Sequence, residues 1–416
     1  MGKETLNNRV ELMAPLKNWK SFDAIINFAD AVYFGVEDLN MRSFADNFKL
    51  EELPKLVQKC HNSNIKAYLT LNVIVYENEF GYIENILEKC GEADIDAVIV
   101  HDMGVIDMIK QKELKFHIST QSNISNSYAA RFFESLGAKR LILARELSLE
   151  QIKEIKSKLK RAEVEAFVHG AQCTSISGRC YFSAELCGSQ EFSANRGKCI
   201  QPCRGKWTVY DEKNNTLIYD GAFFINTKDL CMIEHIPQLI DAQIDAFKIE
   251  GRMRDPIYIE TTVKCYKEAI EAYFNGSFSE EKVQKWMKEL RKVYNRGFST
   301  GFYFGMPRGE EIYLDKNGNT SEFRKLEIGR VLNYFPEKKA AKLLLHAGKL
   351  RLGDEIFIIG KNTNTYLRQE IKSLRIKKKS LVETPRILKG SNLAIGIIVD
   401  KPVRKNDRVY LLTKKN

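Results

Sequence analysis

The chain has 416 residues, of which 44% are hydrophobic and 29% charged, and its formal net charge at pH 7 is +11. A chain of this length and composition forms roughly two or three globular domains with sizeable cores. No apolar run reaches the roughly 18 residues of a membrane span, and the polar start of the chain lacks the apolar segment of a signal peptide. We therefore expect a cytoplasmic protein with no membrane partner.

The positive charge is concentrated in the last quarter of the chain. Residues 320–416 contain 23 Lys and Arg against 9 Asp and Glu, a net charge of +14, whereas the rest of the chain has a net charge of −3. A basic module beside a nearly neutral body is typical of proteins that bind a polyanion, most often nucleic acid. The alternative is a lysine-rich surface that is simply solvated.

Eight short runs rich in Val, Ile, Phe and Tyr alternate with helical stretches in the first part of the chain. They cover residues 10–15, 31–36, 65–72, 97–102, 115–121, 140–145, 164–170 and 246–252. The runs are continuously apolar rather than alternating, which is typical of parallel strands buried on both faces. The pattern predicts an α/β fold with a TIM-like (β/α)8 barrel. A doubly wound open sheet is the alternative.

Two domains follow from this pattern. Residues 1–310 form the predicted catalytic domain, and we place the boundary within a glycine-rich connector that ends between residues 305 and 322. Residues 320–416 contain β-type runs separated by Gly, Asn and Lys turns. They predict a small antiparallel β-barrel or sandwich, and its charge makes it the expected RNA-binding domain.

Polar residues gather at the ends of the predicted strands, where a barrel of this kind places its active site. They are Glu11, Asn40, Arg42, Asn72, Asp102, Gln121, Arg145, His169, Lys248, Glu250 and Arg252. Each of them also has the simpler interpretation of a helix cap or turn residue. That alternative is weaker for Lys248 and Glu250, because both point to the same side of one strand and are costly to bury without a partner.

Six of the nine cysteines lie within one seventh of the chain, in a predicted insertion of residues 171–245 between the seventh and eighth strands. They are Cys173, Cys180, Cys187, Cys199, Cys203 and Cys231. In a cytoplasmic protein, clustered cysteines are more often metal ligands than disulfides. The absence of a C-x2-C pair disfavours zinc, and separated thiolates suit an iron–sulfur cluster. Spacing alone leaves zinc, iron–sulfur and buried or disulfide-bonded cysteines open.

A hydrolytic site is a further alternative. A cysteine or serine beside His169 would form a nucleophile–base pair. However, the chain has only six histidines and contains neither a G-x-S-x-G nor an H-E-x-x-H motif. Nothing specific in the sequence therefore supports peptide hydrolysis.

Four motifs together resemble the signature of a known family. They are HGAQCTSISGRCYFS at residues 169–183, NRGKCIQPCR at 195–204, KDLC at 228–231 and FKIEGRMR at 247–254. They are similar to those of the collagenase-like peptidases, family thirty-two of the peptidases of unknown type. With its basic C-terminal domain, the chain looks most like the branch that hydroxylates tRNA.

The resemblance implies a 4Fe–4S cluster held by Cys173, Cys180, Cys199 and Cys231, with Cys203 as an alternative to Cys199 and Cys187 as a structural residue. It implies oxygen-independent hydroxylation of the wobble uridine of tRNA to 5-hydroxyuridine, with prephenate as co-substrate and the iron–sulfur assembly machinery as a partner. Peptide hydrolysis and hydroxylation of ribosomal RNA are the alternatives.

The remaining site residues are assigned from their placement at strand ends. Arg145, Lys248 and Arg252 are expected to bind the carboxylates of prephenate. Arg42 and Gln121 are also expected to bind substrate, and His169 and Glu250 are the candidate proton-transfer groups.

Overall fold

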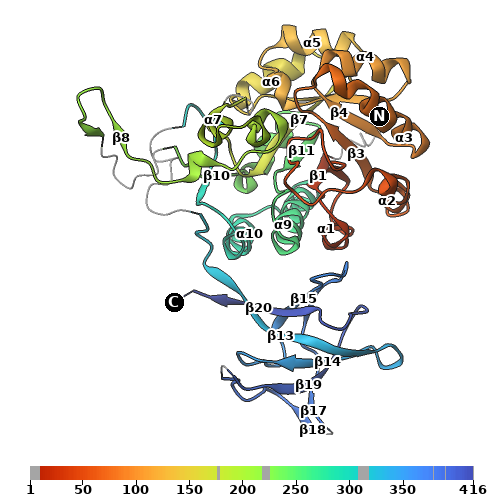
Figure 1. The fold of residues 1–416 in the computed structure, drawn as a ribbon, viewed down its shortest axis with the longest axis vertical. Helices are drawn as coiled ribbons and strands as arrows, with labels where there is room; N and C mark the ends of the chain where they lie inside the picture. The colour runs from red at the N-terminus through yellow and green to blue at the C-terminus, as the bar shows by residue number, and fades with distance from the viewer. Residues whose placement is uncertain are drawn as a thin grey trace. The chain divides into compact units, whose positions relative to one another are not determined.

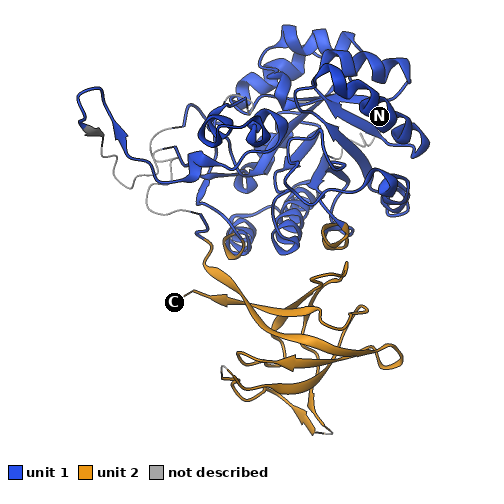
Figure 2. Ribbon diagram, viewed as in Figure 1, with its two compact units in different colours: residues 1–18, 25–290, 294–320 blue, residues 19–24, 291–293, 321–416 orange. Residues whose placement is uncertain are grey.

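The computed structural model describes residues 10–175, 179–217, 225–307, 318–377, 379–388 and 390–415. The chain divides into two compact units (Figure 2). The first contains the described residues within 1–18, 25–290 and 294–320, and the second those within 19–24, 291–293 and 321–416. Residues 308–317, within the predicted domain boundary, lie outside the described residues.

The first unit contains a closed barrel of eight parallel strands (Figure 1). They are β1 (Glu11–Pro15), β2 (Ala31–Phe34), β3 (Lys66–Leu71), β4 (Ala97–Val100), β5 (Phe116–Ile118), β6 (Arg140–Ile142), β7 (Glu163–Gly170) and β11 (Ala246–Ile249). The last strand pairs with both β1 and β7, so the sheet has no free edge. The predicted TIM-like barrel is confirmed, and the open-sheet alternative is wrong.

Continuous apolar runs produce these strands because both faces of each strand are buried. The four residues of β4, AVIV, are all buried, as are the four residues of β2. Inside the barrel, Met13, Tyr33, Tyr68 and Ile99 pack in one layer. Parallel strands covered by helices are typically apolar throughout.

Each barrel strand is followed along the chain by a helix. These are α1 (Trp19–Ile25), α2 (Leu53–His61), α3 (Phe80–Glu92), α4 (Met103–Gln111), α5 (Ser127–Ser135), α6 (Leu149–Lys158), α8 (Ile236–Asp241) and α9 (Pro256–Phe274), and α10 (Glu280–Lys292) comes after them. Asp102 begins α4 by accepting a hydrogen bond from the Val105 amide at 3.1 Å, so this strand-end residue is a helix cap. Within the described residues, every helix is too short or too polar to cross a membrane.

The insertion between β7 and β11 contains little regular structure. It has one short helix, α7 (Phe182–Cys187), a two-stranded hairpin of β8 (Val209–Tyr210) and β9 (Thr216–Leu217), and β10 (Asp229–Cys231). β10 pairs antiparallel with the end of β7 and parallel with β12 (Phe298–Ser299). The insertion therefore extends the barrel sheet beside the carboxyl end of β7 before α8 completes the seventh unit.

The second unit is an eight-stranded antiparallel sheet, as expected from its turn-rich sequence. Its strands are β13 (Phe323–Phe335), β14 (Ala340–Leu345), β15 (Glu355–Ile359), β16 (Tyr366–Glu370), β17 (Leu374–Ile376), β18 (Lys379–Leu381), β19 (Leu393–Ile398) and β20 (Arg408–Lys414). Alternating apolar residues such as Leu343, Ile356 and Ile395 form one core. On β13, the exposed positions include Arg324, Lys325 and Arg330.

Gly170 ends β7 in a conformation that other residues rarely adopt. Its φ is +108°, and an added Cβ would lie 2.4 Å from the Glu250 carbonyl oxygen. We expect Gly170→Ala to lower the free energy of unfolding by about 1–3 kcal/mol, because backbone strain adds to the steric conflict. Urea denaturation of the full chain measures this loss.

Gly91→Ala is the matched control for this substitution. Gly91 lies in α3, and nothing lies within 4 Å of the position of an added Cβ. Alanine is favoured over glycine in a helix by roughly 0.5–1 kcal/mol, so this variant should be as stable as the wild type or more so. Equal stability of the two variants would contradict the assigned role of Gly170.

Candidate active site at the barrel mouth

A cavity of about 230 Å³ lies at the carboxyl ends of the barrel strands, with the insertion forming part of its wall. Six of the predicted site residues line it, namely Arg42, Gln121, Arg145, Lys248, Glu250 and Arg252. Four cysteines of the insertion line the same cavity: Cys173, Cys180, Cys199 and Cys203. Two groups of residues that are distant in sequence therefore meet at one surface.

The local backbone around three of these cysteines is arranged to hydrogen-bond their sulfur atoms. Cys173, Cys180 and Cys199 each accept a hydrogen bond from the amide two residues later, at 3.4, 3.4 and 3.2 Å respectively. Amide donors at a sulfur stabilise the thiolate form, which is the form that binds metals and iron–sulfur clusters. All nine cysteines are free of disulfides.

The sulfur atoms of the cavity are close enough to influence one another. Burial raises the pKa of Cys199, and the neighbouring Cys173 and Cys180 raise it further. Burial likewise raises the pKa of Cys203, with added contributions from Cys173 and Cys199. Both shifts favour the neutral thiols, because thiolates placed together repel one another unless a positive partner such as a metal lies among them. Among the described residues, however, no three His, Cys, Asp or Glu side chains converge closely enough to hold a single metal ion.

Cys231, the predicted fourth ligand, is not among the residues that line the cavity. Cys231 lies on β10 opposite His169, and its sulfur lies 3.9 Å from both the Met287 sulfur and the Tyr266 hydroxyl oxygen. Alternate residues of a strand point to opposite sides, and here Cys231 points toward the helices. Cys203, which the sequence named only as an alternative, lines the cavity with the other three cysteines.

His169 is also outside the cavity wall, although it was a predicted proton-transfer residue. Its side chain is buried among the rings of Tyr258, Tyr266 and Phe298, and its Nδ1 lies 3.3 Å from the Tyr266 hydroxyl. Burial lowers the pKa of His169 to about 3. The imidazole is therefore neutral at physiological pH and supports the packing of β7 rather than proton transfer in the cavity.

Glu250 is fixed as an anion by the arginines of the cavity. Its Oε1 lies 3.2 Å from both Nε and Nη2 of Arg42. Burial alone would raise the pKa of Glu250, but Arg42, Arg145 and Arg252 outweigh burial and hold it below its ordinary value. The carboxylate is thus better suited to orient Arg42 than to donate a proton.

Arg252 is a buried cation whose protein partners are neutral. Its Nη1 donates to the Thr70 hydroxyl at 3.1 Å and its Nη2 donates to the Asn47 side-chain oxygen, while its Nε has no hydrogen-bond partner among the described residues. Burial lowers the pKa of Arg252 to about 10. A guanidinium that is 2% exposed and lacks a direct carboxylate partner is suited to binding an anionic ligand.

The insertion is fastened to the barrel just before Cys199. Arg196 forms an ion pair with Glu79 and donates to the Ile74 carbonyl oxygen, both in the loop after β3. At Gly197, whose φ is +75°, an added Cβ would lie 2.1 Å from the Asn40 carbonyl oxygen. The close approach explains the glycine and fixes the cysteine segment against the loops that carry Arg42 and Asn72.

The comparisons with known proteins place this architecture in a family. The family model of Peptidase family U32 matches residues 17–313. The chain belongs to this family. It is 42% identical to an uncharacterized protease of Methanocaldococcus jannaschii, over 97% of this chain and 98% of that protein.

Two further relatives have names that point to different activities. A collagenase of Porphyromonas gingivalis is 36% identical over 98% of this U32 chain and 99% of its own length. The tRNA hydroxylation protein P1 of Bacillus subtilis is 34% identical over 86% of this chain and 85% of its own length.

Several cavity residues of this U32 chain were not singled out from the sequence. Tyr33, Thr70 and Ser119 all line the cavity, and Asn72 donates to the Ser119 hydroxyl oxygen at 3.0 Å. Tyr33, Thr70 and Ser119 each lie within a predicted strand, whereas Asn72 was already expected as a strand-end residue. Their signal was the same strand-end position that identified Gln121, but hydroxyl and amide residues are common there as turn formers.

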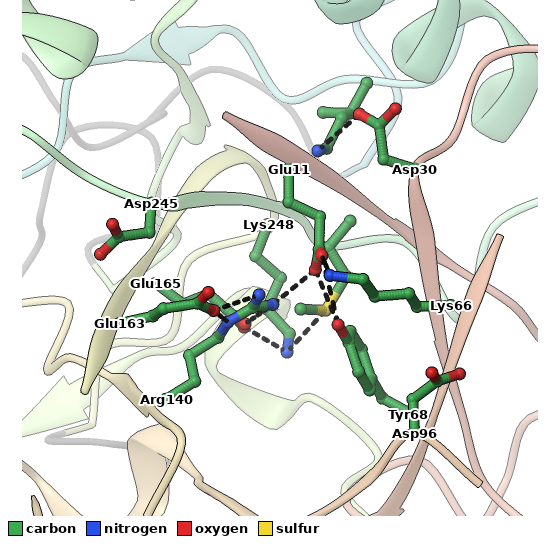
Figure 3. Close-up of polar contacts among 12 residues, drawn as sticks. Glu11, Asp30, Lys66, Tyr68, Asp96, Arg140, Glu163, Glu165, Asp245 and Lys248 are labelled. Carbon is green, nitrogen blue, oxygen red and sulfur yellow. Dashed lines mark hydrogen bonds and ion pairs between the residues drawn. The ribbon is translucent and has the colours of Figure 1, made fainter. Parts of the chain in front are cut away.

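A buried network of charges underlies the cavity (Figure 3). Lys248 Nζ lies 2.7 Å from Glu165 Oε1, and the other oxygen of Glu165 lies 3.4 Å from Arg140 Nη1. The same Arg140 nitrogen lies 2.6 Å from Glu11, which also pairs with Lys66 at 2.7 Å. Lys248 therefore already has a carboxylate partner inside the barrel, whereas the partners of Arg252 are neutral.

Glu11 should make stability depend on pH. Burial raises the pKa of Glu11, but Arg140 and Lys66 outweigh it and lower the pKa below the ordinary value. The stabilisation is therefore complete above the unfolded pKa of about 4.3 and is lost as the pH falls through the lower folded pKa. At pH 7 we expect Glu11→Gln to reduce the free energy of unfolding by about 3 kcal/mol, because Arg140 loses a buried partner.

Glu163→Gln provides the control, since Glu163 pairs with the same arginine but its side chain is 48% exposed. Its loss should be about 1 kcal/mol or less. Denaturation at several pH values measures both variants, and Glu11→Gln should show the shallower loss of stability in acid. Similar losses for the two variants at pH 7 would contradict the larger contribution to stability that we assign to the buried Glu11–Arg140 pair.

Proposed function

We propose that this chain is an RNA-modifying enzyme that hydroxylates the wobble uridine of tRNA to 5-hydroxyuridine without oxygen, using prephenate and a 4Fe–4S cluster. The observation that carries the proposal is the meeting of four cysteines and four arginines at one cavity. The similarity to the tRNA hydroxylation protein P1 of Bacillus subtilis supports tRNA as the substrate. Hydroxylation of ribosomal RNA is the alternative reaction. Nucleoside analysis of a deletion strain distinguishes the two RNA substrates.

Cys173, Cys180, Cys199 and Cys203 are the residues that would hold the cluster. Four thiolates are the ligand set of a 4Fe–4S cluster, and the amide hydrogen bonds to their sulfurs suit that role. A single zinc ion would need all four sulfurs within about 2.3 Å of one point, whereas a cluster presents its iron atoms at separate corners. When bound, the cluster would supply a one-electron redox centre beside the substrate.

Arg145 and Arg252 are the proposed ligands of the prephenate carboxylates. Arg252 is the stronger of the two because its buried guanidinium has only neutral partners, Thr70 and Asn47. Arg145 lies over the Phe167 ring at 5.5 Å, which fixes its guanidinium at the cavity wall. Binding an anion there would offset the cost of keeping these cations away from water.

Gln121 and Arg42 are the proposed contacts to RNA at the cavity. The Gln121 amide offers both a donor and an acceptor, which matches the edge of a uracil base turned out of its stack. Arg42 is oriented by Glu250 at 3.2 Å and remains partly exposed, so it can reach a phosphate or a base at the entrance.

The second unit supplies the proposed grip on the RNA backbone. Residues 320–416 carry a net charge of +14, and Arg324, Lys325 and Arg330 of β13 are exposed. Lys325 also lies over the Tyr410 ring at 5.0 Å. Clustered cations of this kind bind phosphates in a salt-dependent manner, and stacked aromatic residues suit unpaired bases.

Peptide hydrolysis is the rival function, because one relative is named a collagenase. The described wall of the cavity contains no histidine, and its one carboxylate, Glu250, is held by Arg42. A peptidase would need a base or a metal to activate its nucleophile. The cysteines and the basic second unit would also have no role in such an enzyme.

Nucleoside analysis of a deletion strain tests the proposed reaction. Mass spectrometry of its tRNA should show loss of 5-hydroxyuridine and its derivatives, and the wild-type gene should restore them. Complementation with Arg252→Gln should restore about a tenth of the modification or less, because a charged hydrogen-bonding partner of the co-substrate is lost. Unchanged tRNA together with a missing hydroxycytidine in ribosomal RNA would instead identify the alternative substrate.

Anaerobic purification followed by iron and sulfide assays tests the ligand set. Cys203→Ser should lose iron, sulfide and visible absorbance, because a ligand of the cluster is removed. Cys231→Ala and Cys187→Ser are the controls and should retain them. Retention in Cys203→Ser with loss in Cys231→Ala would reverse the assignment, and a colourless wild-type protein without iron would reject the cluster.

A further inference from the structure

Lys248 is a buried amine at the cavity for which the proposed function gives no chemical role. Its side chain is 5% exposed, and its Nζ lies 2.7 Å from Glu165, 3.5 Å from the Met13 sulfur and 4.2 Å from the centre of the Tyr33 ring. It nevertheless lines the cavity. The amine is thus held on one side by a carboxylate and faces a ligand space on the other.

The charges around Lys248 balance when Lys248 carries one positive charge. Glu11, Glu163 and Glu165 lie opposite Lys66, Arg140 and Lys248 in one connected network (Figure 3). Any chemistry at this amine must therefore preserve its positive charge, because loss of one partner from a buried ion pair is strongly destabilising.

Arg252 provides the second recognition element of the same cavity. Its guanidinium is buried, its partners Thr70 and Asn47 are neutral, and its Nε has no partner among the described residues. Lys248 and Arg252 lie four residues apart on the last barrel strand and its immediate continuation. Both line the same cavity as Tyr33, whose ring centre lies 4.2 Å from Lys248 Nζ. An amine and an arginine that line one cavity can bind a ligand with adjacent carbonyl and carboxylate groups.

We propose that Lys248 and Arg252 form a site for a 2-oxo carboxylic acid, which Lys248 holds as a protonated imine. The Nζ attacks the keto carbon, a carbon–nitrogen double bond replaces the carbon–oxygen double bond, and the keto oxygen leaves as water with two protons from the ammonium group. No electrons are gained or lost. The carboxylate beside the keto carbon pairs with Arg252.

The product keeps the network intact. A protonated imine carries the same positive charge as the original ammonium group and retains one N–H, which can continue to donate to Glu165. Burial lowers the pKa of Lys248, against the effect of Glu165 and together with that of Arg140. More of the amine is then in the neutral, nucleophilic form than in an exposed lysine.

This inference goes beyond the proposed function, since it concerns the chemistry of the cavity and requires no RNA. Prephenate belongs to the 2-oxo acids, so the site would also give the proposed co-substrate a defined attachment. A failure of the imine would leave the nucleoside experiment unaffected, and a failure of RNA hydroxylation would leave the imine testable.

Reductive trapping tests the site in the purified full-length protein. Pyruvate or phenylpyruvate is added with sodium borohydride, and intact mass followed by peptide mapping locates the adduct. The expected result is one reduced 2-oxo acid residue on Lys248. Acetone, which has the ketone but no carboxylate, should label this residue at least about tenfold less, since it lacks the charged partner of Arg252.

Two arginine substitutions provide matched controls that preserve charge. Lys248→Arg should abolish the adduct, whereas Lys66→Arg alters the other lysine of the network, which pairs with Glu11, and should leave labelling unchanged. No adduct on Lys248 in the wild type, or equal labelling by acetone and pyruvate, would overturn the proposal. Adducts on exposed lysines at the same level as on Lys248 would also overturn the proposal.

Discussion

The carboxylate of Glu165 is the point on which the barrel and its cavity both depend. It is fully buried on β7 and lies between Arg140 of β6 and Lys248 of β11. A buried charge is tolerated only when its partners are in place, so this contact requires the three strands to lie in one register. Arg140 extends the requirement to Glu11 on β1. The ion pairs inside the barrel therefore also fix the floor of the cavity.

The barrel could be predicted from the sequence because its signal is local and repeated. Each strand is a short apolar run, because a strand that is buried on both faces is apolar at nearly every position. Lys248 and Glu250 were expected on one side of a strand, and both line the cavity. The partner of Lys248 could not be predicted in the same way, because Glu165 lies on another strand with no local mark of the pairing.

In the insertion, the directions of the side chains could not be predicted from the sequence. The number and spacing of its cysteines indicate a site, but they do not give the direction of each side chain. Cys231 lies on β10, which pairs with β7, and its sulfur lies near Met287, whereas Cys203 lines the cavity from a short 3-10 helix, Pro202–Arg204. The surroundings of His169 could not be predicted for a similar reason, since its position at a strand end does not reveal the aromatic residues that enclose it.

The pairing of β11 with β1 joins Ala246 to Glu11, and the cavity is assembled across this junction. Cys173 follows β7 on one side, while Arg42 follows β2 on the other. Contacts between segments so far apart in sequence form late in folding, because the intervening chain must first be ordered. During synthesis, the cysteine segment emerges before the strand that closes the barrel. The cavity therefore reaches its final form only when β11 pairs with both β1 and β7.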